Sequence, residues 1–379
     1  MRLELTDEQQ MIRTMAREFA QAHVAPIASE IDREARFPHE TVKRMGELGL
    51  LGIMVPEQWG GAGADTVSYV VALEEISRVC ASHGVVMSVN NSLYCDPIWK
   101  YGTDAQRARF LKPVASGHAL GCFALTEPEA GSDARNQRTL AVRDGGDYVI
   151  TGRKMFISTG REASFVLVFA QTDAERAHRG ISAFVVEKGT PGLSVSKTED
   201  KLGIRASDTA ELVFDGCRVP VANRIGEEGK GFHIALATLD GGRIGIAAQA
   251  VGIAAGAYDR SVAYARERKA FGVPIGQHQM VQWMIADMAT AIDGARLITL
   301  KAATLKDAGK PYTKEASMAK LFAAETAMKV ATDAVQIHGG YGYIREAEVE
   351  RYFRDAKITQ IYEGTSQIQK LVIAREVLK

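Results

Sequence analysis

The stretch Leu140-Ala141-Val142-Arg143-Asp144-Gly145-Gly146-Asp147-Tyr148-Val149-Ile150-Thr151 decides the fold class of this chain. Its two halves are rich in β-branched and aromatic residues, and Asp-Gly-Gly-Asp between them has the composition of a tight hairpin turn. Comparable segments predict further strands at 165–171, 181–187, 193–197 and 211–219. The sequence therefore predicts a β domain in the middle of the chain, beginning near Gly121.

Both flanks of this β region have helical patterns. Thr6 and Gln9 form a potential capping box, and helical runs follow at 38–48, 66–80, 85–101 and 104–116. After Gly229, long helical runs are predicted at 232–268, 277–307, 313–338, 346–358 and from Ser366 onward. Long runs with short connections are typical of a helical bundle. We therefore predict an α+β protein with an N-terminal helical domain (1–119), a middle β domain (120–228) and a C-terminal helical bundle (229–379).

Composition excludes several classes of protein. A chain of 379 residues with 46 basic and 46 acidic side chains has no net charge, so no global field attracts nucleic acid or an anionic membrane. We expect neither as a partner. The start, 1–5, has no apolar core of a signal peptide, and the longest apolar stretch, 244–255, is interrupted by polar residues. The expected location is cytoplasmic, or the mitochondrial matrix if a transit peptide was removed.

Metal and nucleotide motifs are missing from the sequence. The four cysteines form no CxxC pair, and the eight histidines show no metal-ligand spacing, so we predict no metal and buried reduced thiols. No GxGxxG follows a predicted strand, and the glycine-rich stretch 226–231 lacks the spacing and hydroxyl of a P-loop. A nicotinamide-binding Rossmann domain is therefore disfavoured.

Glu363 is the best candidate for a catalytic base. It lies in the turn 361–366, Ile-Tyr-Glu-Gly-Thr-Ser, and no Lys or Arg falls between Ile358 and Gln369. We expect its pKa to rise once an apolar ligand excludes water. The alternative is a solvated Glu at the start of the last helix, with Thr365 or Ser366 as the N-cap.

Four other segments concentrate small residues, hydroxyls and backbone donors suited to a large planar ligand. The segment 122–133 is a strand that enters a loop, and 154–158 places Phe156 and Ser158 on one face if it is extended. The segment 336–342 is a helix end that opens into glycines, and 268–272 pairs a cation with an aromatic ring.

Together, and in this order with Glu363 last, these segments resemble the acyl-CoA dehydrogenase family, and the resemblance runs from Leu5 to the C-terminus. The likeness is greatest to the short-chain, butyryl-CoA members, through 87–94, 200–205, 239–247 and 354–356. It implies an N-terminal helical domain, a β domain and a C-terminal four-helix bundle that enclose FAD, usually in a homotetramer. Mild departures occur at Ser158, Thr159 and His338, where the family usually has Thr, Asn and an apolar residue.

The resemblance also implies roles for individual residues. Those at the cofactor would be Leu125, Thr126, Ser132, Phe156, Ile157, Ser158, Thr365 and Gln367, with Arg268, Phe271, Gln279, Gln336, Gly339 and Gly340 reaching the FAD of a neighbouring subunit. Those at the substrate would be Ser132, Asp240, Arg243, Gln249, Thr359, Tyr362 and Gly364. Gln249 and Thr359 would close the pocket floor and favour chains of about C4 to C6. In the alternative, Gln249 bonds across the bundle and Thr359 is an ordinary helix residue.

The implied reaction is FAD-dependent α,β-dehydrogenation of a short-chain acyl-CoA to the trans-2-enoyl-CoA, as in fatty acid β-oxidation. Glu363 would remove the α-proton while the β-hydride goes to flavin N5, and an electron-transfer flavoprotein would take the electrons. A backbone N–H at Glu363 and a ribityl hydroxyl of FAD would stabilise charge on the thioester oxygen. The alternatives are an acyl-CoA oxidase that uses O2 and a non-catalytic acyl-CoA-binding scaffold.

Overall fold

The N-terminal part of the computed structural model, which describes residues 4–379, is helical, as predicted. Residues 1–3 of the predicted first domain lie outside the described residues. The helix α1 (Asp7–Phe19) begins with the predicted capping box: Gln9 N donates to Thr6 Oγ1, and Thr6 N donates to Gln9 Oε1. The helices that follow are α2 (Ala28–Glu34), α3 (His39–Glu47), α4 (Thr66–Val79), α5 (Ala81–Ser88), α6 (Asp96–Tyr101), α7 (Asp104–Gln106) and α8 (Lys112–Ala115). A π-helical segment, Val89–Cys95, joins α5 to α6.

The middle part is a β-sheet. Its strands are β1 (Gly121–Ala124), β2 (Leu140–Asp144), β3 (Asp147–Ser158), β4 (Phe165–Gln171), β5 (Ile181–Glu187), β6 (Leu193–Thr198), β7 (Thr209–Pro220) and β8 (Arg224–Ile225). Within the described residues the order is β6-β7-β3-β2-β4-β5-β8, and β1 pairs in parallel with β4. The predicted hairpin is confirmed, because Asp144 pairs with Asp147 and Gly145 takes the positive φ that the turn requires.

Strand β3 is longer than predicted and is bulged. Its pairing with β7 shifts between Lys154 and Ile157, and Phe156 has φ +58°. The simple two-residue alternation expected for 154–158 therefore does not hold, because the bulge turns the chain and re-aims Phe156.

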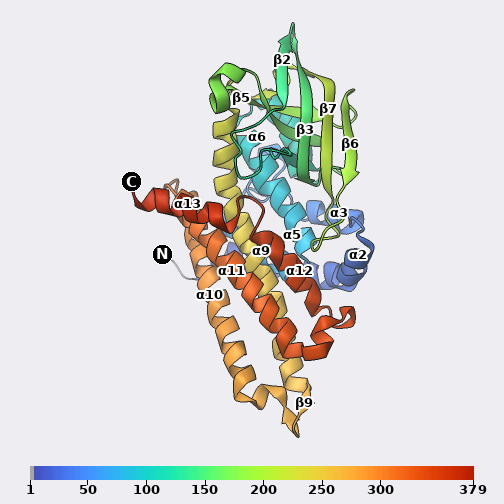
Figure 1. The fold of residues 1–379 in the computed structure, drawn as a ribbon, viewed down its shortest axis with the longest axis vertical. Coiled ribbons are helices and arrows are strands. Elements are labelled where there is room, and N and C mark those ends of the chain that lie inside the picture. Colours follow the sequence, from blue (N-terminus) through green and yellow to red (C-terminus); the bar gives the residue numbers. More distant parts are fainter. Residues whose placement is uncertain (1–3) are drawn as a thin grey trace.

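The C-terminal part is a helical bundle built around one long helix, α9 (Gly231–Glu267). It packs against α4, α10 (Gln279–Asp307) and α11 (Thr313–His338), and α11 also packs on α12 (Val349–Thr359) and α13 (Ser366–Val377). In Figure 1, α9 runs from beside the sheet to the opposite end of the molecule, where the small hairpin of β9 (Lys269–Ala270) and β10 (Val273–Pro274) lies. Where α9 crosses α4, a Cβ on Gly252 would lie 2.5 Å from the Glu74 carbonyl oxygen, so only glycine permits this approach.

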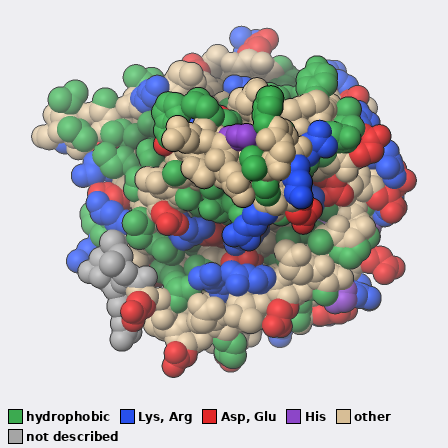
Figure 2. All heavy atoms as spheres, turned by 90° about the horizontal axis from the view of Figure 1, so that it is seen from below, with side chains coloured by type: hydrophobic (Ala, Val, Ile, Leu, Met, Phe, Trp, Pro, Cys, Tyr) green, Lys and Arg blue, Asp and Glu red, His purple; other side chains and the backbone are tan. Residues whose placement is uncertain are grey.

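The surface and interior agree with the composition. Figure 2 shows Lys and Arg side chains alongside Asp and Glu on the face that includes the bundle end. All four cysteines are buried and unpaired, as predicted, within the part of the chain that the structure describes. Among residues 4–379, no helix combines the length and apolarity needed to cross a membrane. No three His, Cys, Asp or Glu side chains of these described residues are grouped as metal ligands.

Candidate active site

A cavity opens where the N-terminal helices, the sheet and the bundle meet. One wall is apolar and comes from α5 and the π-helical segment, and the others come from the β1 loop, the bulge of β3, α9 and the turn before α13. We call it the central cavity, and its lining residues include Val85, Val89, Leu93, Phe123, Leu125, Thr126, Ser132, Phe156, Ile157, Ser158, Leu239, Arg243, Tyr362, Glu363 and Gly364.

Glu363 enters the central cavity from a strained turn between α12 and α13. It has φ +51°, a left-handed conformation that is uncommon for residues other than glycine, and Gly364 follows with φ +91°. Gln369 holds this turn, since its Nε2 donates to the carbonyl oxygens of Glu363 (3.2 Å) and Gly364 (2.9 Å). We call residues 363 and 364 the base turn. Thr365 is the N-cap of α13 and accepts a hydrogen bond from Ile368 N, as one sequence interpretation expected.

The carboxyl group of Glu363 has one oxygen that is removed from solvent. Its Oε2 atom is buried and has no hydrogen-bond partner among the described residues. Burial raises the pKa of Glu363 to about 8, although Lys320 and Arg243 act in the opposite direction. The predicted rise in pKa is thus present before any ligand excludes water. Helix α9 passes directly beneath this carboxylate, because a Cβ on Gly242 would lie 2.1 Å from Oε2.

Arg243, which follows Gly242 on α9, is buried rather than on the surface. Only 5% of the residue is exposed, and Nη1 donates to Asp240 and to Ser317 Oγ. Its Nε atom is buried without a partner among residues 4–379. Asp240 also accepts a hydrogen bond from Thr313 Oγ1 at 2.6 Å. The ion pair of Arg243 and Asp240 therefore has a fixed orientation, and Nε of Arg243 is a donor that no described protein group uses.

The opposite side of the central cavity carries the residues predicted to lie at a planar ring. The structure brings Leu125, Thr126, Ser132, Phe156, Ile157 and Ser158 together there. Phe156 is 61% exposed, an unusual amount for a phenylalanine that lines a cavity. The loop between β1 and β2 is held by buried Lys154, whose Nζ donates to Leu125 O (3.1 Å) and Glu127 Oε1 (2.7 Å).

Gln249 and Thr359 do not line the central cavity, although the sequence interpretation placed them at its floor. Both are fully buried. Gln249 Nε2 donates across the bundle to Ala81 O, and its Oε1 accepts the hydroxyl of Tyr362, which does line the cavity. Thr359 donates to Ala356 O within its own helix. Any influence of Gln249 on the cavity is therefore indirect, through Tyr362 or through α5, to which it also donates.

The residues expected to reach a neighbouring subunit lie apart from the central cavity. Arg268, Gly339 and Gly340 border a separate hollow at the far end of the bundle, where Arg268 stacks over the ring of Tyr341. Phe271, in the β9–β10 connection, is 96% exposed. Gln279 begins α10, and Gln336 is on the last turn of α11. Gln367, which was expected at the cofactor of its own chain, is exposed in the first turn of α13 and does not belong to this set. The chain by itself does not bring this set to Glu363.

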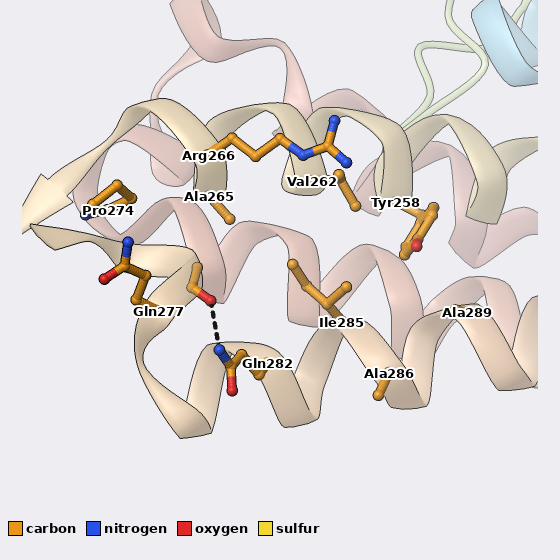
Figure 3. A pocket seen from close by; sticks show the side chains of 11 residues that line it. Tyr258, Val262, Ala265, Arg266, Pro274, Gln277, Gln282, Ile285, Ala286 and Ala289 are labelled. Carbon is orange, nitrogen blue, oxygen red and sulfur yellow. Dashed lines mark hydrogen bonds between the residues drawn. The ribbon is translucent and has the colours of Figure 1, made fainter.

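A third hollow lies nearby, between α9 and α10. Figure 3 shows Tyr258, Val262 and Ala265 facing Ile285 and Ala286 across it. Gln282 Nε2 donates to Gly276 O at 3.0 Å at its edge. Its lining is mostly apolar and holds no group of titratable side chains arranged for catalysis.

Sequence reasoning missed two buried lysines that support the site. Lys154 holds the cofactor-side loop, and Lys320 of α11 donates from Nζ to Gly364 O at 2.7 Å. Burial lowers the pKa of each ammonium group to about 8. The only local signal is that Lys320 falls on the apolar stripe of its helix, since Ser317, Ala319, Ala323 and Ala324 around it are also buried.

Comparisons with known proteins agree with this architecture. Three domain families match the chain along its length: acyl-CoA dehydrogenase N-terminal domain (6–118), middle domain (122–217) and C-terminal domain (229–378). The "Acyl-CoA dehydrogenase, short-chain specific" of Clostridium acetobutylicum is 53% identical over 99% of both chains. The "Acryloyl-CoA reductase (NADH)" of Anaerotignum propionicum is 51% identical over 99% of this chain and 95% of its own.

Solved structures show the same similarity. Butyryl-CoA dehydrogenase from Megasphaera elsdenii has a TM-score of 0.98 and 45% identity, with both chains fully covered. A chain solved in work on the electron transferring flavoprotein of Acidaminococcus fermentans has a TM-score of 0.99 and 50% identity, again over both full lengths. A glutaryl-CoA dehydrogenase of Mycobacterium smegmatis, in complex with FADH2, has a TM-score of 0.93 and 32% identity over 98% of this chain and 95% of its own.

The similarity over nearly the whole chain to a dehydrogenase solved with FADH2 identifies the class of protein as a flavoprotein oxidoreductase. The matches to three acyl-CoA dehydrogenase domains identify the family within this class. The chain belongs to the acyl-CoA dehydrogenase family.

Proposed function

We propose that this protein catalyses the α,β-dehydrogenation of short-chain acyl-CoA thioesters, with Glu363 as the base that removes the α-proton. The observation that carries the proposal is the buried, unpartnered Oε2 of Glu363 facing a cavity whose wall is Val85, Val89 and Leu93. A carboxylate that nothing else binds, beside an apolar wall, suits a base that meets an acyl chain. The relatives named for short-chain acyl-CoA and butyryl-CoA support this substrate class.

Several residues of the chain would hold the thioester for this step. Arg243, fixed by Asp240, presents a buried donor for a polar atom of the CoA arm, and Ser132 offers a hydroxyl on the opposite side. Tyr362 and Gly364 flank the base. With the thioester seated, Glu363 would accept the α-proton, and its raised pKa places it near the value expected for a base that works close to neutral pH.

The site fits FAD as the cofactor. Phe156 presents an exposed ring at the cavity. The same cavity is lined by the hydroxyl groups of Thr126, Ser132 and Ser158. An aromatic surface with a few hydroxyl donors suits a polar heteroaromatic ring. Bound FAD would supply a hydride acceptor for the β-carbon. The relative solved with FADH2 supports this assignment. We also propose that Arg268, Phe271, Gln279, Gln336, Gly339 and Gly340 contact the cofactor of a second subunit in a homotetramer, since this chain alone keeps them from the central cavity.

We propose that the electron acceptor is an electron-transfer flavoprotein. Support comes from the 50% identical chain that was solved in work on the electron transferring flavoprotein of Acidaminococcus fermentans. One observation favours a second candidate function, the reduction of an enoyl-CoA. A relative named acryloyl-CoA reductase is 51% identical, and the same base would deliver the α-proton in the reverse direction.

Domain boundaries at 1–119, 120–228 and 229–379 are also proposed. Support comes from the family matches, which leave gaps at 119–121 and 218–228. In the structure, β1 begins at Gly121 and α9 at Gly231.

The decisive experiment is anaerobic bleaching of the flavin by butyryl-CoA in wild type and in Glu363→Gln. We expect the variant to retain FAD and ligand binding and to lose flavin reduction by several orders of magnitude, because an amide cannot accept the proton. Glu346→Gln, which changes an exposed carboxylate between α11 and α12, is the matched control. Near-normal bleaching in Glu363→Gln would overturn the assignment of the base.

Re-oxidation of the bleached enzyme then identifies the acceptor. Rapid recovery with an electron-transfer flavoprotein and slow recovery in air would support the proposal, whereas rapid recovery in air would indicate an oxidase. Oxidation of NADH in the presence of acryloyl-CoA and the flavoprotein would support the reductase direction.

A further inference from the structure

Lys320 is a buried cation directly behind the base turn. The residue has no exposed surface, and Nζ donates to Gly364 O at 2.7 Å. Burying an ammonium group costs several kcal/mol unless it meets opposite charge or good acceptors. A lysine in this position therefore needs a compensating interaction, and the structure points to the adjacent carboxylate.

The charged and titratable groups around the base turn come from three elements. Helix α11 contributes Lys320 and Glu325, α9 contributes Arg243 with its partner Asp240, and α4 contributes the neutral hydroxyl of Tyr69. Glu325 is already bound by the hydroxyl of Ser366 and by the amide of Gln360. Arg243 is largely engaged by Asp240. Lys320 makes its single side-chain hydrogen bond among the described residues to a neutral carbonyl, so its charge, when it is protonated, acts on Glu363.

The same contact holds the strained backbone. Glu363 and Gly364 both have positive φ, and the two carbonyl oxygens of the base turn receive hydrogen bonds from Gln369 and Lys320. A strained conformation persists only where its surroundings determine it. Gln369 provides a neutral donor and Lys320 a charged one, so the two can be separated experimentally.

We propose that Lys320 is a positioning residue of the reaction: its ammonium group holds the Gly364 carbonyl, which orients the base turn, and its charge stabilises the Glu363 carboxylate. This inference rests on the proposed function, in which Glu363 is the base. The electrostatics agree in direction, since Lys320 lowers the pKa of Glu363 while Glu363 raises that of Lys320.

The test is the pH dependence of flavin reduction by butyryl-CoA in the holoenzyme. The base must be ionised, so the rate falls as pH falls through the pKa of Glu363. In Lys320→Met the carboxylate of Glu363 loses a nearby positive charge, so its pKa rises. We expect the acid limb, the low-pH side of the profile of rate against pH, to move up by about one pH unit or more. This corresponds to roughly a tenfold loss of rate on the acid side. Lys320→Arg retains the charge and is expected to restore the position of the limb.

Gln369→Leu is the matched control, because it removes the neutral donor to the same carbonyl and leaves the charge. We expect a lower rate at every pH with the acid limb in its wild-type position. An unshifted limb in Lys320→Met would show a merely structural role and overturn the proposal. Retention of FAD and a cooperative thermal transition establish that each variant is folded.

Two outcomes separate this inference from the proposed function. Normal flavin reduction in Glu363→Gln refutes the assigned base, whatever Lys320 does. Loss of reduction in Glu363→Gln together with an unshifted limb in Lys320→Met refutes the role of Lys320 alone. If Lys320→Met does not fold, Lys320→Gln replaces it, and failure of both to fold would make Lys320 a residue of the fold and also overturn the proposal.

Discussion

Replacing the base should make the protein more stable at neutral pH. The pKa of Glu363 is about 8 in the folded chain against an ordinary value of 4.5, so between these values the folded state holds its proton more tightly than the unfolded state. Stability therefore falls as pH rises through this window, because the unfolded state releases the proton and ionises while the folded state keeps the carboxyl group neutral. The cost to the wild type at pH 7 is about 3 kcal/mol, and Glu363→Gln avoids it because its amide never ionises.

The measurement is the midpoint of thermal unfolding of the holoenzyme from pH 5 to pH 9. At roughly 2.1 cal/mol/K per residue, the unfolding entropy of a chain this long makes ~3 kcal/mol equal to a shift of about 4 °C. We expect Glu363→Gln and wild type to be within about 1 °C of each other at pH 5 and to diverge steadily above it. Glu346→Gln, which lacks the burial, should follow the wild type throughout. Parallel pH curves for wild type and Glu363→Gln would refute the reasoning.

Three further predictions concern the central cavity. Gly242→Ala places a methyl group against the Glu363 carboxylate, so flavin reduction should fall about 100-fold while FAD absorbance is retained, and an unchanged rate would show that the base has room to move. Gln249→Gly frees the hydroxyl of Tyr362 and is expected to shift the optimum of kcat/KM among C4, C8 and C12 acyl-CoAs toward longer chains; a wild-type optimum at C8 or longer, or no shift in the variant, would count against this. Glutaryl-CoA should be turned over far more slowly than butyryl-CoA, because 84–96 contains no Lys or Arg to pair with its second carboxylate; equal turnover would contradict the prediction.

The order of the elements could be predicted because its signals are local. The helical pattern over 313–338 coincides with α11, and the Asp-Gly-Gly-Asp turn forms the hairpin at the expected residues. The bulge in β3 was not predicted, since the positive φ of Phe156 depends on pairing with β7, a strand more than 50 residues away. Local propensity contains no information about such a partner.

The candidate site, like the fold, could be predicted only where its features depend on residues that are close together in the sequence. Glu363 could be selected from its own turn, but the cations that act on it come from α9 and α11, far along the chain. A lysine in a sequence is usually read as a surface residue, and only the packing of the folded chain shows that Lys320 and Lys154 are buried. The expected rise in the pKa of Glu363 was attributed to a future ligand, whereas burial in the folded chain already produces it.

The length of α9 has an evolutionary consequence. This one helix sets Gly252 against α4 and Gly242 beneath the base, and then continues to the hairpin at the far end. Each added or deleted residue within it would rotate everything beyond by about 100° and translate it by about 1.5 Å. Insertions and deletions should therefore be purged from 242–252 and accumulate instead in the loops of the sheet, where a change of length is confined to the connection between two strands.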